Sequence, residues 1–244
     1  MAVTRDKQEE RPLRIHQGIA RQIGSEILFG HHLPGAAFEG EIEMAERLGV
    51  SRTAYREAMR ILVAKGLLES RPKAGTHVTP RHRWNLLDPE ILAWMFSGTP
   101  DERFVRDLFE LRGIIEPAAA ALAATRRSDA QVAQLRGALA QMSACGLAED
   151  AGQAADRQFH RTILEASDNE ALISLAGSIG AAVQWTTRFK QRVSEHPRNA
   201  IEEHSAVCES IAAGDPQRAQ AAMGELLDHS LEDMKLERLA RRCS

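Results

Sequence analysis

From Asp88 to the C-terminus the sequence shows only helical periodicity, and this feature restricts the possible folds most. Apolar residues recur at helical spacing through seven segments: 88–97, 101–125, 128–145, 152–167, 169–192, 197–213 and 216–240. Turn-forming residues such as Gly98-Thr99-Pro100 and Gly214-Asp215-Pro216 separate the segments. Seven helices joined by short turns predict an antiparallel all-α bundle.

The N-terminal part has a different pattern. Isoleucines at every fourth position from Ile15 to Ile27 predict a first helix that stops near Gly30. A short helix, a turn at Gly49-Val50-Ser51 and a longer helix ending at Gly66 follow. Two short β-like runs flank residues 72–75 and predict a hairpin. This order of elements predicts a winged helix-turn-helix, in which Ser51 is a good N-cap for the second helix.

Basic residues concentrate in one short region, although the whole chain carries a net charge of −3. Between Ser51 and Arg83, eight Lys and Arg stand against two acids, a local charge of +6. The longer helix places its basic residues on one face, and such a face can reach guanine edges or phosphates in a major groove. The alternative is a solvated helix face in an ordinary bundle. The candidate DNA-contacting residues are Ser51, Arg52, Thr53, Arg56, Arg60, Lys73, Gly75 and Thr76.

The chain is therefore predicted to be mainly α with two domains. The predicted parts are a disordered polar tail (1–10), a winged helix-turn-helix DNA-binding domain (11–80), a linker (81–87) and an all-α domain (88–240). The three cysteines are scattered, the first residues carry no apolar signal segment, and no apolar run approaches the roughly 20 residues of a membrane span. We expect a cytoplasmic protein with no membrane partner.

Four polar residues are expected to face the interior of the bundle. Asp156 and His160 lie one helical turn apart on an otherwise apolar face, and His204 and Arg112 share apolar faces on two other helices. An unpaired carboxylate would be costly there. The carboxylate and the two histidines could hold a divalent cation, and the arginine could bind a carboxylate ligand bidentately. The alternative is a buried structural pair, because a lone inward histidine is usually a satisfied core residue.

The stretch GVSRTAYREAMRILVAKGLLESRPKAGTHV closely resembles the winged helix of GntR-family bacterial regulators, a resemblance that covers about residues 14–80. It implies that Arg52 and Arg56 contact bases and phosphates, with Thr53 and Gly75 in support. Many members carry S/A-E-R-E-L at the start of the first of the two helices, and their arginine touches phosphate. This chain has Glu41-Ile42-Glu43-Met44 there, so that contact is lost.

Residues 88–236 resemble the helical FCD effector domain of the FadR branch of that family. The pattern D-x-x-x-H (Asp156, His160), followed by His204, implies a divalent metal (Zn, Ni or Mn) on which a small carboxylate effector docks. Arg112 in LRGIIEP matches an arginine that contacts the effector. Trp185 and Arg188, on the helix after the Asp–His pair, are candidates to line the effector cavity, and a core role is the alternative for Trp185. Leu226 stands where four-ligand members have a third histidine, and His229 is a poor substitute, so three protein ligands remain.

The segment WNLLDPEILAWM (84–95) resembles a run found in repressors of galactonate-type sugar-acid operons. The leading hypothesis is therefore a homodimeric transcription regulator and not an enzyme. It would repress from operator DNA until a sugar acid such as an aldonate binds. The alternatives are a metal-dependent enzyme acting on a small carboxylate and a metal-free helical regulator. The first alternative lacks an inward carboxylate placed as a general base.

Overall fold

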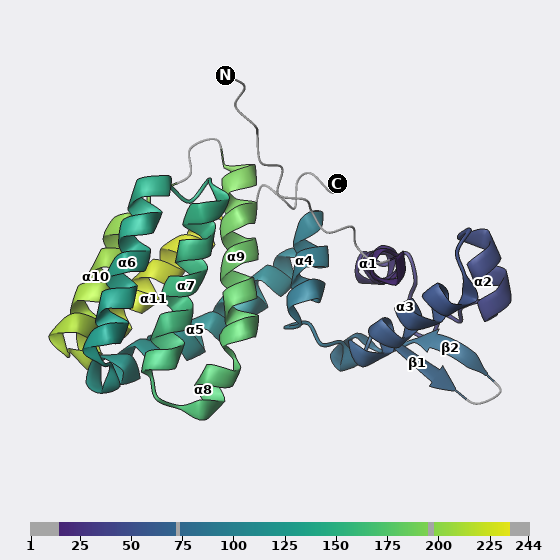
Figure 1. Ribbon diagram of the computed structural model, residues 1–244, viewed down its shortest axis with the longest axis horizontal. Helices are drawn as coiled ribbons and strands as arrows, with labels where there is room; N and C mark the ends of the chain where they lie inside the picture. Colours follow the sequence, from purple (N-terminus) through teal and green to yellow (C-terminus); the bar gives the residue numbers. More distant parts are fainter. Residues whose placement is uncertain (1–14, 72–73, 195–197, 235–244) are drawn as a thin grey trace, which may run out of the picture. The chain divides into compact units, whose positions relative to one another are not determined.

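The computed structural model describes residues 15–71, 74–194 and 198–234, and it is mainly α-helical with one two-stranded sheet (Figure 1). These elements confirm the predicted fold class. The predicted tail at residues 1–10 lies outside the described residues, as do Lys73 and residues 235–240, where the last predicted helix ends. The described residues form two compact units, which divide between Leu86 and Leu87.

The first unit contains the predicted winged helix-turn-helix. Its elements are α1 (Ile15–Leu28), α2 (Glu41–Arg47), α3 (Arg52–Ala64), β1 (Leu68–Arg71), β2 (Gly75–Val78) and the 3-10 helix η1 (Arg81–Arg83). Helices α1 and α2 pack against α3, and the strands pair antiparallel with Leu68 opposite Val78. Ile19, Ile23 and Ile27 are buried, as the periodicity of the first helix predicted.

Local chemistry sets where α3 begins and ends. Gly49, in the turn before it, has φ +65°, a left-handed conformation that favours glycine. Ser51 caps α3 as predicted, because its Oγ accepts a hydrogen bond from the Ala54 N–H at 3.2 Å. Beyond α3, Gly66 has φ +74°, and a Cβ there would lie 2.2 Å from the carbonyl oxygen of Arg83. Ser51 therefore defines the start of α3, and Gly66 allows the chain to turn sharply after the helix ends.

The second unit contains eight helices within its described residues. They are α4 (Pro89–Ser97), α5 (Glu102–Arg126), α6 (Asp129–Cys145), α7 (Asp150–Ala166), α8 (Glu170–Ser174), α9 (Ala176–Val193), α10 (Ile201–Ala213) and α11 (Pro216–Glu232). Five of them begin with side-chain caps, which come from Asp88, Asp101, Ser128, Asn169 and Asp215. None of the described helices is long and apolar enough to cross a membrane.

One predicted helix is wrong in the second unit. The segment 169–192 forms two helices, α8 and α9, which are separated at Leu175. The Leu175 N–H bonds the carbonyl of Leu172, three residues back, so the helix tightens there. Leu175 keeps a right-handed helical backbone, with φ −83° and ψ −8°. Hydrophobic periodicity continues through such a break and does not reveal it.

The interior of the second unit lies among α5, α7, α9, α10 and α11. Helix α5 packs on α7 and α11, and α7 also packs on α9, while α10 packs on α5 and α11. Figure 1 shows α7 between α6 and α9. The core side chains include Phe159, Ile163, Val207, Ile211 and Met223. This packing brings the inward polar residues of α5, α7 and α10 to one place.

Candidate functional sites

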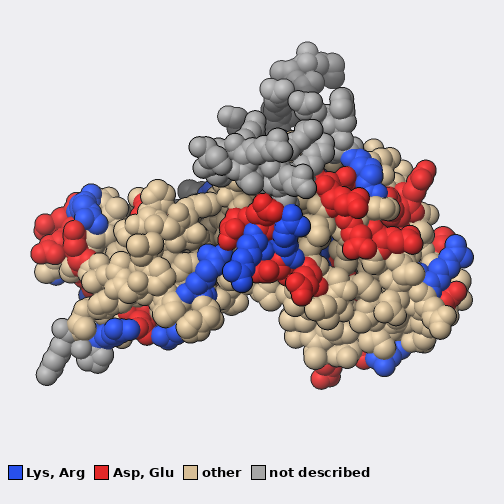
Figure 2. Space-filling model, turned by 180° about the vertical axis from the view of Figure 1, so that it is seen from behind, with Lys and Arg blue, Asp and Glu red and all other residues tan. Residues whose placement is uncertain are grey.

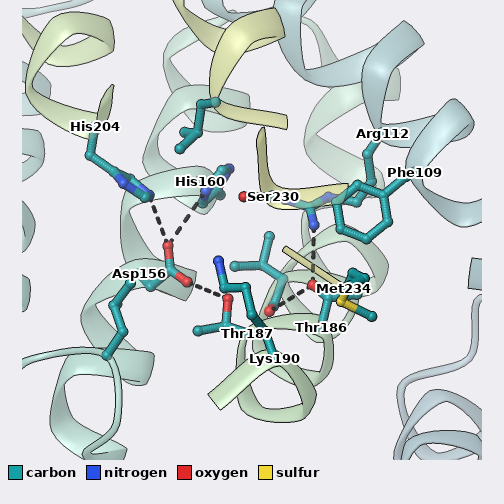
Figure 3. Close-up of a pocket in the computed structure, with 13 residues that line it drawn as sticks. Phe109, Arg112, Asp156, His160, Thr186, Thr187, Lys190, His204, Ser230 and Met234 are labelled. Atoms are coloured by element: carbon teal, nitrogen blue, oxygen red, sulfur yellow. Dashed lines mark hydrogen bonds and ion pairs between the residues drawn. The ribbon is translucent and has the colours of Figure 1, made fainter. Parts of the chain in front are cut away.

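Asp156, His160 and His204 come together in the interior of the second unit. Each is only 2–3% exposed, and their ligand atoms all lie within 4.8 Å of one another. The Nε2 atom of His204 lies 3.1 Å from Asp156 Oδ1, and the Nε2 atom of His160 lies 3.5 Å from the same oxygen (Figure 3). The structure therefore places the three predicted metal ligands around one point.

The other ring nitrogen of each histidine has an acceptor of its own. His204 Nδ1 lies 2.6 Å from the carbonyl oxygen of Ala200, and His160 Nδ1 contacts Glu116 Oε2. Because a carbonyl and a carboxylate only accept, both Nδ1 atoms must donate N–H. Each neutral imidazole then presents a lone pair on Nε2. Fixing the tautomer through Nδ1 is what second-shell partners of metal-bound histidines do.

This arrangement fits a divalent cation. When both imidazoles are neutral, their Nε2 lone pairs point at Asp156 Oδ1, which is also an acceptor. Three acceptor atoms this close together repel one another unless a positive charge lies among them. The second carboxylate oxygen, Oδ2, accepts a hydrogen bond from Thr187 at 2.9 Å. Burial alone raises the pKa of Asp156, but its contacts with His160 and His204 outweigh burial and hold that pKa well below its usual value. A protonated histidine is the other way to supply the charge.

Glu116 belongs to the candidate site, and the sequence analysis did not single it out. It lies on α5, where one oxygen contacts His160 and the other accepts from Arg112 Nε at 2.6 Å. Burial raises the pKa of Glu116, but Arg112 and His160 lower it to about 2. The same Glu116, with Asp156, raises the pKa of His160 to about 9 against the effect of burial. The signal was present in LRGIIEP, because Arg112 and Glu116 stand four residues apart on one helical face.

A small cavity adjoins the three ligands. Its volume is about 20 Å³, and its wall includes the predicted Arg112 together with Phe109, Thr186, Thr187, Lys190 and Met234 (Figure 3). Arg112 also donates from Nη1 to Thr186 at 3.2 Å. The cavity has room for about one water-sized particle.

Trp185 and Arg188, predicted to line the cavity, are not on its wall. Arg188 is exposed, stacks on Trp185 at 5.5 Å and pairs with Asp150 at 3.0 Å. At about 100° per residue, positions 185 and 188 lie on the side of α9 opposite to 186, 187 and 190. Lys190, which is buried and lines the cavity, was not singled out from the sequence.

Leu226, on α11, occupies the cavity wall and is 1% exposed. His229 lies one turn later, its side chain is 47% exposed, and its Nδ1 is 3.5 Å from Glu203 Oε1. The structure therefore brings together three candidate ligands and keeps His229 away from them. An apolar side chain stands on the α11 side of the site.

Seven of the eight candidate DNA-contacting residues lie within the described part of the first unit, and Lys73 lies outside it. Those of α3 and its cap are exposed, while Tyr55, Ala58 and Leu62 on the opposite face are buried. On the wing, Gly75 is exposed and has φ +88°, and Thr76 is half-buried. The exposed candidates of α3 and its cap are Ser51, Arg52, Thr53, Arg56 and Arg60.

Acidic side chains pair with much of the basic face. Arg56 donates to both oxygens of Glu41, at 2.7 and 3.1 Å, and Arg60 pairs with Glu57 at 2.6 Å. The hydrogen bond from Arg56 lowers the pKa of Glu41. Within the described part of the chain, Arg52 has no salt bridge. Figure 2 shows red side chains among the blue ones over this unit, toward the left of the view. Glu41 lies on α2, outside residues 51–83, so the local charge of +6 counted over those residues does not include it.

Comparisons with known proteins identify the family of each unit. The family model described as "Bacterial regulatory proteins, gntR family" matches residues 15–78, and the model described as "FCD domain" matches residues 107–229. The solved structure of Lar, which controls the expression of the Listeria monocytogenes agr system, has a TM-score of 0.63 at 17% identity. That match covers 91% of this chain and 96% of the other, and it supports the fold.

Two relatives from Escherichia coli (strain K12) match over most of their length. The galactonate operon transcriptional repressor is 30% identical over 215 residues, which are 87% of this chain and 93% of that protein. The uncharacterized HTH-type transcriptional regulator YieP is 34% identical over 211 residues, 86% of this chain and 90% of that protein. The chain therefore belongs to the GntR family of bacterial regulatory proteins and is a transcriptional regulator with an FCD domain.

Proposed function

We propose that this regulator is a repressor whose operator affinity is lowered by a small carboxylate, a sugar acid such as an aldonate, bound beside a divalent metal. The observation that carries the proposal is the convergence of His160 Nε2 and His204 Nε2 on one oxygen of Asp156 inside the bundle. The named relative that represses a galactonate operon supports the choice of a sugar acid.

The charges around the cavity favour an anionic ligand. With His160 neutral, as metal binding requires, two buried cations, Arg112 and Lys190, balance two buried carboxylates, Glu116 and Asp156. A divalent cation adds two positive charges to this set. Uncompensated charge in a water-poor interior is costly, so the loaded site attracts an anion.

Asp156, His160 and His204 would hold the metal, and the bound cation would supply positive charge and open coordination positions to the ligand. Two imidazoles and one carboxylate suit Zn, Ni or Mn. Glu116 keeps the His160 Nδ1 proton in place, and the Ala200 carbonyl does the same for His204. The Arg112–Glu116 pair in turn holds Glu116 in its ionised form. These residues orient the ligands and do not react themselves.

The DNA half of the proposal rests on the exposed face of α3. Arg52 and Arg56 would reach base edges and phosphates in a major groove, Ser51, Thr53 and Arg60 would support them, and Gly75 would let the wing approach the backbone. Lys73 and Thr76 on the wing complete the proposed contacts. A homodimer would present two such units to an approximate palindrome. A DNA partner would require a cytoplasmic protein, which is also what the sequence predicts.

Ligand binding requires the cavity wall to move. The cavity volume of about 20 Å³ is far below the roughly 300–1,000 Å³ of ordinary small-molecule pockets. A sugar acid therefore fits only when residues of α9 or α11 shift. A ligand that binds the shifted form more tightly changes the population of the two forms, and this differential affinity is what couples it to DNA binding.

A metal analysis combined with thermal unfolding tests the proposal. We expect about one divalent metal ion per chain, and D-galactonate or D-gluconate should raise the unfolding temperature of the metal-loaded protein. Asp156→Ala should lose both the metal and the ligand effect, whereas Asp150→Ala, an exposed change on the same helix, should keep both. Stoichiometric metal in Asp156→Ala would contradict the ligand assignment, and turnover of either sugar acid would favour the enzyme alternative.

A further inference from the structure

Lys190 is a buried cation beside the three candidate ligands. Its side chain is 5% exposed, and Figure 3 shows it entering the cavity from α9 on the side of Asp156. Its Nζ lies 3.8 Å from Asp233 Oδ2, an ion-pair distance that is longer than a hydrogen bond. A buried ammonium without hydrogen bonds to a charged partner is costly, so its environment favours any closer anion.

Asp233 connects this cation to the end of α11. It is the C-cap residue of α11, and its Oδ2 also accepts from Arg198 Nε at 3.2 Å. Its side chain is 21% exposed, so it stands where the interior meets solvent. Ser230 and Met234, which flank Asp233 along the chain, line the cavity. The Lys190–Asp233 pair therefore ties α9 to the segment that closes one side of the cavity.

The two cavity cations are bound with unequal strength. Arg112 donates to Glu116 at 2.6 Å, and both side chains are buried, so exchanging that partner would break a desolvated ion pair. Lys190 has the longer contact, to the carboxylate of Asp233. If this contact breaks, Asp233 remains paired with a second cation, Arg198. An incoming carboxylate displaces the weaker of the two pairs at lower cost. Of the two cations, Lys190 therefore has the ion pair that costs less to exchange.

We propose that Lys190 binds the carboxylate of the sugar-acid ligand and that Asp233 competes with this carboxylate for the same ammonium. This inference rests on the proposed function and adds to it the residue that recognises the anion and the contact that the anion breaks. When the ligand carboxylate binds Lys190, Asp233 remains paired with Arg198. The ion pair between the end of α11 and α9 is then broken. Ligand binding and release of α11 then become one event.

The test compares two substitutions with opposite expected signs. Dissociation constants of D-galactonate and D-gluconate are measured by calorimetry on the full-length, metal-loaded protein. Lys190→Gln should weaken binding about ten-fold or more, because a charge-assisted contact is lost. Asp233→Asn should strengthen binding several-fold, because the competitor is removed. In Lys190→Gln, the added Asp233→Asn change should have no effect on affinity, since the two residues act through one contact.

Arg188→Gln is the matched control. It removes a cation from the same helix two residues away, but Arg188 is exposed and pairs with Asp150 outside the cavity. Its affinity for both sugar acids should equal that of the wild type. Galactitol, which carries a hydroxymethyl group in place of the carboxylate, should bind wild type and Lys190→Gln equally weakly.

Two results overturn the inference while the proposed function stands. One is wild-type affinity in Lys190→Gln at full metal content, and the other is unchanged or weaker binding in Asp233→Asn. If Lys190→Gln does not fold, Asp233→Asn decides alone, because a merely structural ion pair gives no gain in affinity when it is removed. If neither sugar acid binds the wild-type protein, the proposed function itself fails and the inference fails with it.

Discussion

The two polar regions of the molecule differ in what surrounds their charges. On α3, Arg56 and Arg60 pair with acids at the surface, where water and salt screen each contact. Inside the bundle, Glu116 joins Arg112 to His160, and these three side chains are at most 4% exposed. Surface pairs exchange their partners readily, which suits the proposed DNA-binding face, since it would have to give up its acids to bind DNA. The buried network instead holds the proposed metal-ligand atoms in fixed orientations.

The largest expected difference between the two regions is the loss of stability when one partner of an ion pair is removed. Glu116→Gln leaves Arg112 without its charge partner in the interior, so it should lower the free energy of unfolding by about 3–5 kcal/mol. Glu57→Gln removes the surface partner of Arg60 and should change it by less than about 0.5 kcal/mol. Urea unfolding of the metal-free proteins measures both values. Similar losses in the two variants would remove the distinction.

Metal binding should stabilise the protein through the buried region alone. At a free metal concentration of about 100 times its dissociation constant, the free energy of unfolding should rise by about 2.7 kcal/mol. His204→Ala should lose this increase, whereas His229→Ala should keep it, because the side chain of His229 is 47% exposed and lies away from the site. Unfolding with and without a chelator measures the difference. An increase that survives in His204→Ala would place the metal elsewhere.

In the absence of ligand, direct contacts with operator DNA should come from the exposed region. Arg52→Ala should cost about 1–3 kcal/mol of binding to an operator duplex and leave the unfolding temperature nearly unchanged. Arg103→Ala, which removes an exposed cation from α5, is the control and should leave the affinity unaltered. Fluorescence anisotropy at fixed salt, on a duplex selected from a randomised pool, gives the affinities. A loss of folding in Arg52→Ala would show that this face is structural.

The smallest expected effect concerns the acid that pairs with Arg56. Glu41→Gln should strengthen operator binding about two- to five-fold, because it frees Arg56 and removes a charge that repels phosphate. The gain should shrink as salt concentration rises. Weaker binding by Glu41→Gln would show instead that the carboxylate positions the arginine for its contact with DNA.

Sequence reasoning worked where one helix decides the outcome. Periodicity along a single helix placed Arg52 outside and Asp156, His160 and His204 inside, and Ser51 was found as a cap from its place before an amphipathic segment. These predictions need only the rise and turn of a helix.

Sequence reasoning missed contacts between residues of different helices. It also misassigned residues of one helix whose faces had not been compared. Glu116 reaches His160 across 44 positions, and Glu41 reaches Arg56 across 15, so neither pair follows from local pattern. The choice of Trp185 over Lys190 was a different error, because a helical projection of α9 would have separated their faces.

Operator affinity of the metal-loaded protein as D-galactonate is added, at fixed salt, tests the central claim most directly. The account predicts that the affinity falls about 5- to 150-fold as the sugar acid saturates the second unit. It also predicts that His204→Ala binds the same duplex without responding to the ligand. An operator affinity that stays constant in wild type at saturating D-galactonate and D-gluconate would contradict the account.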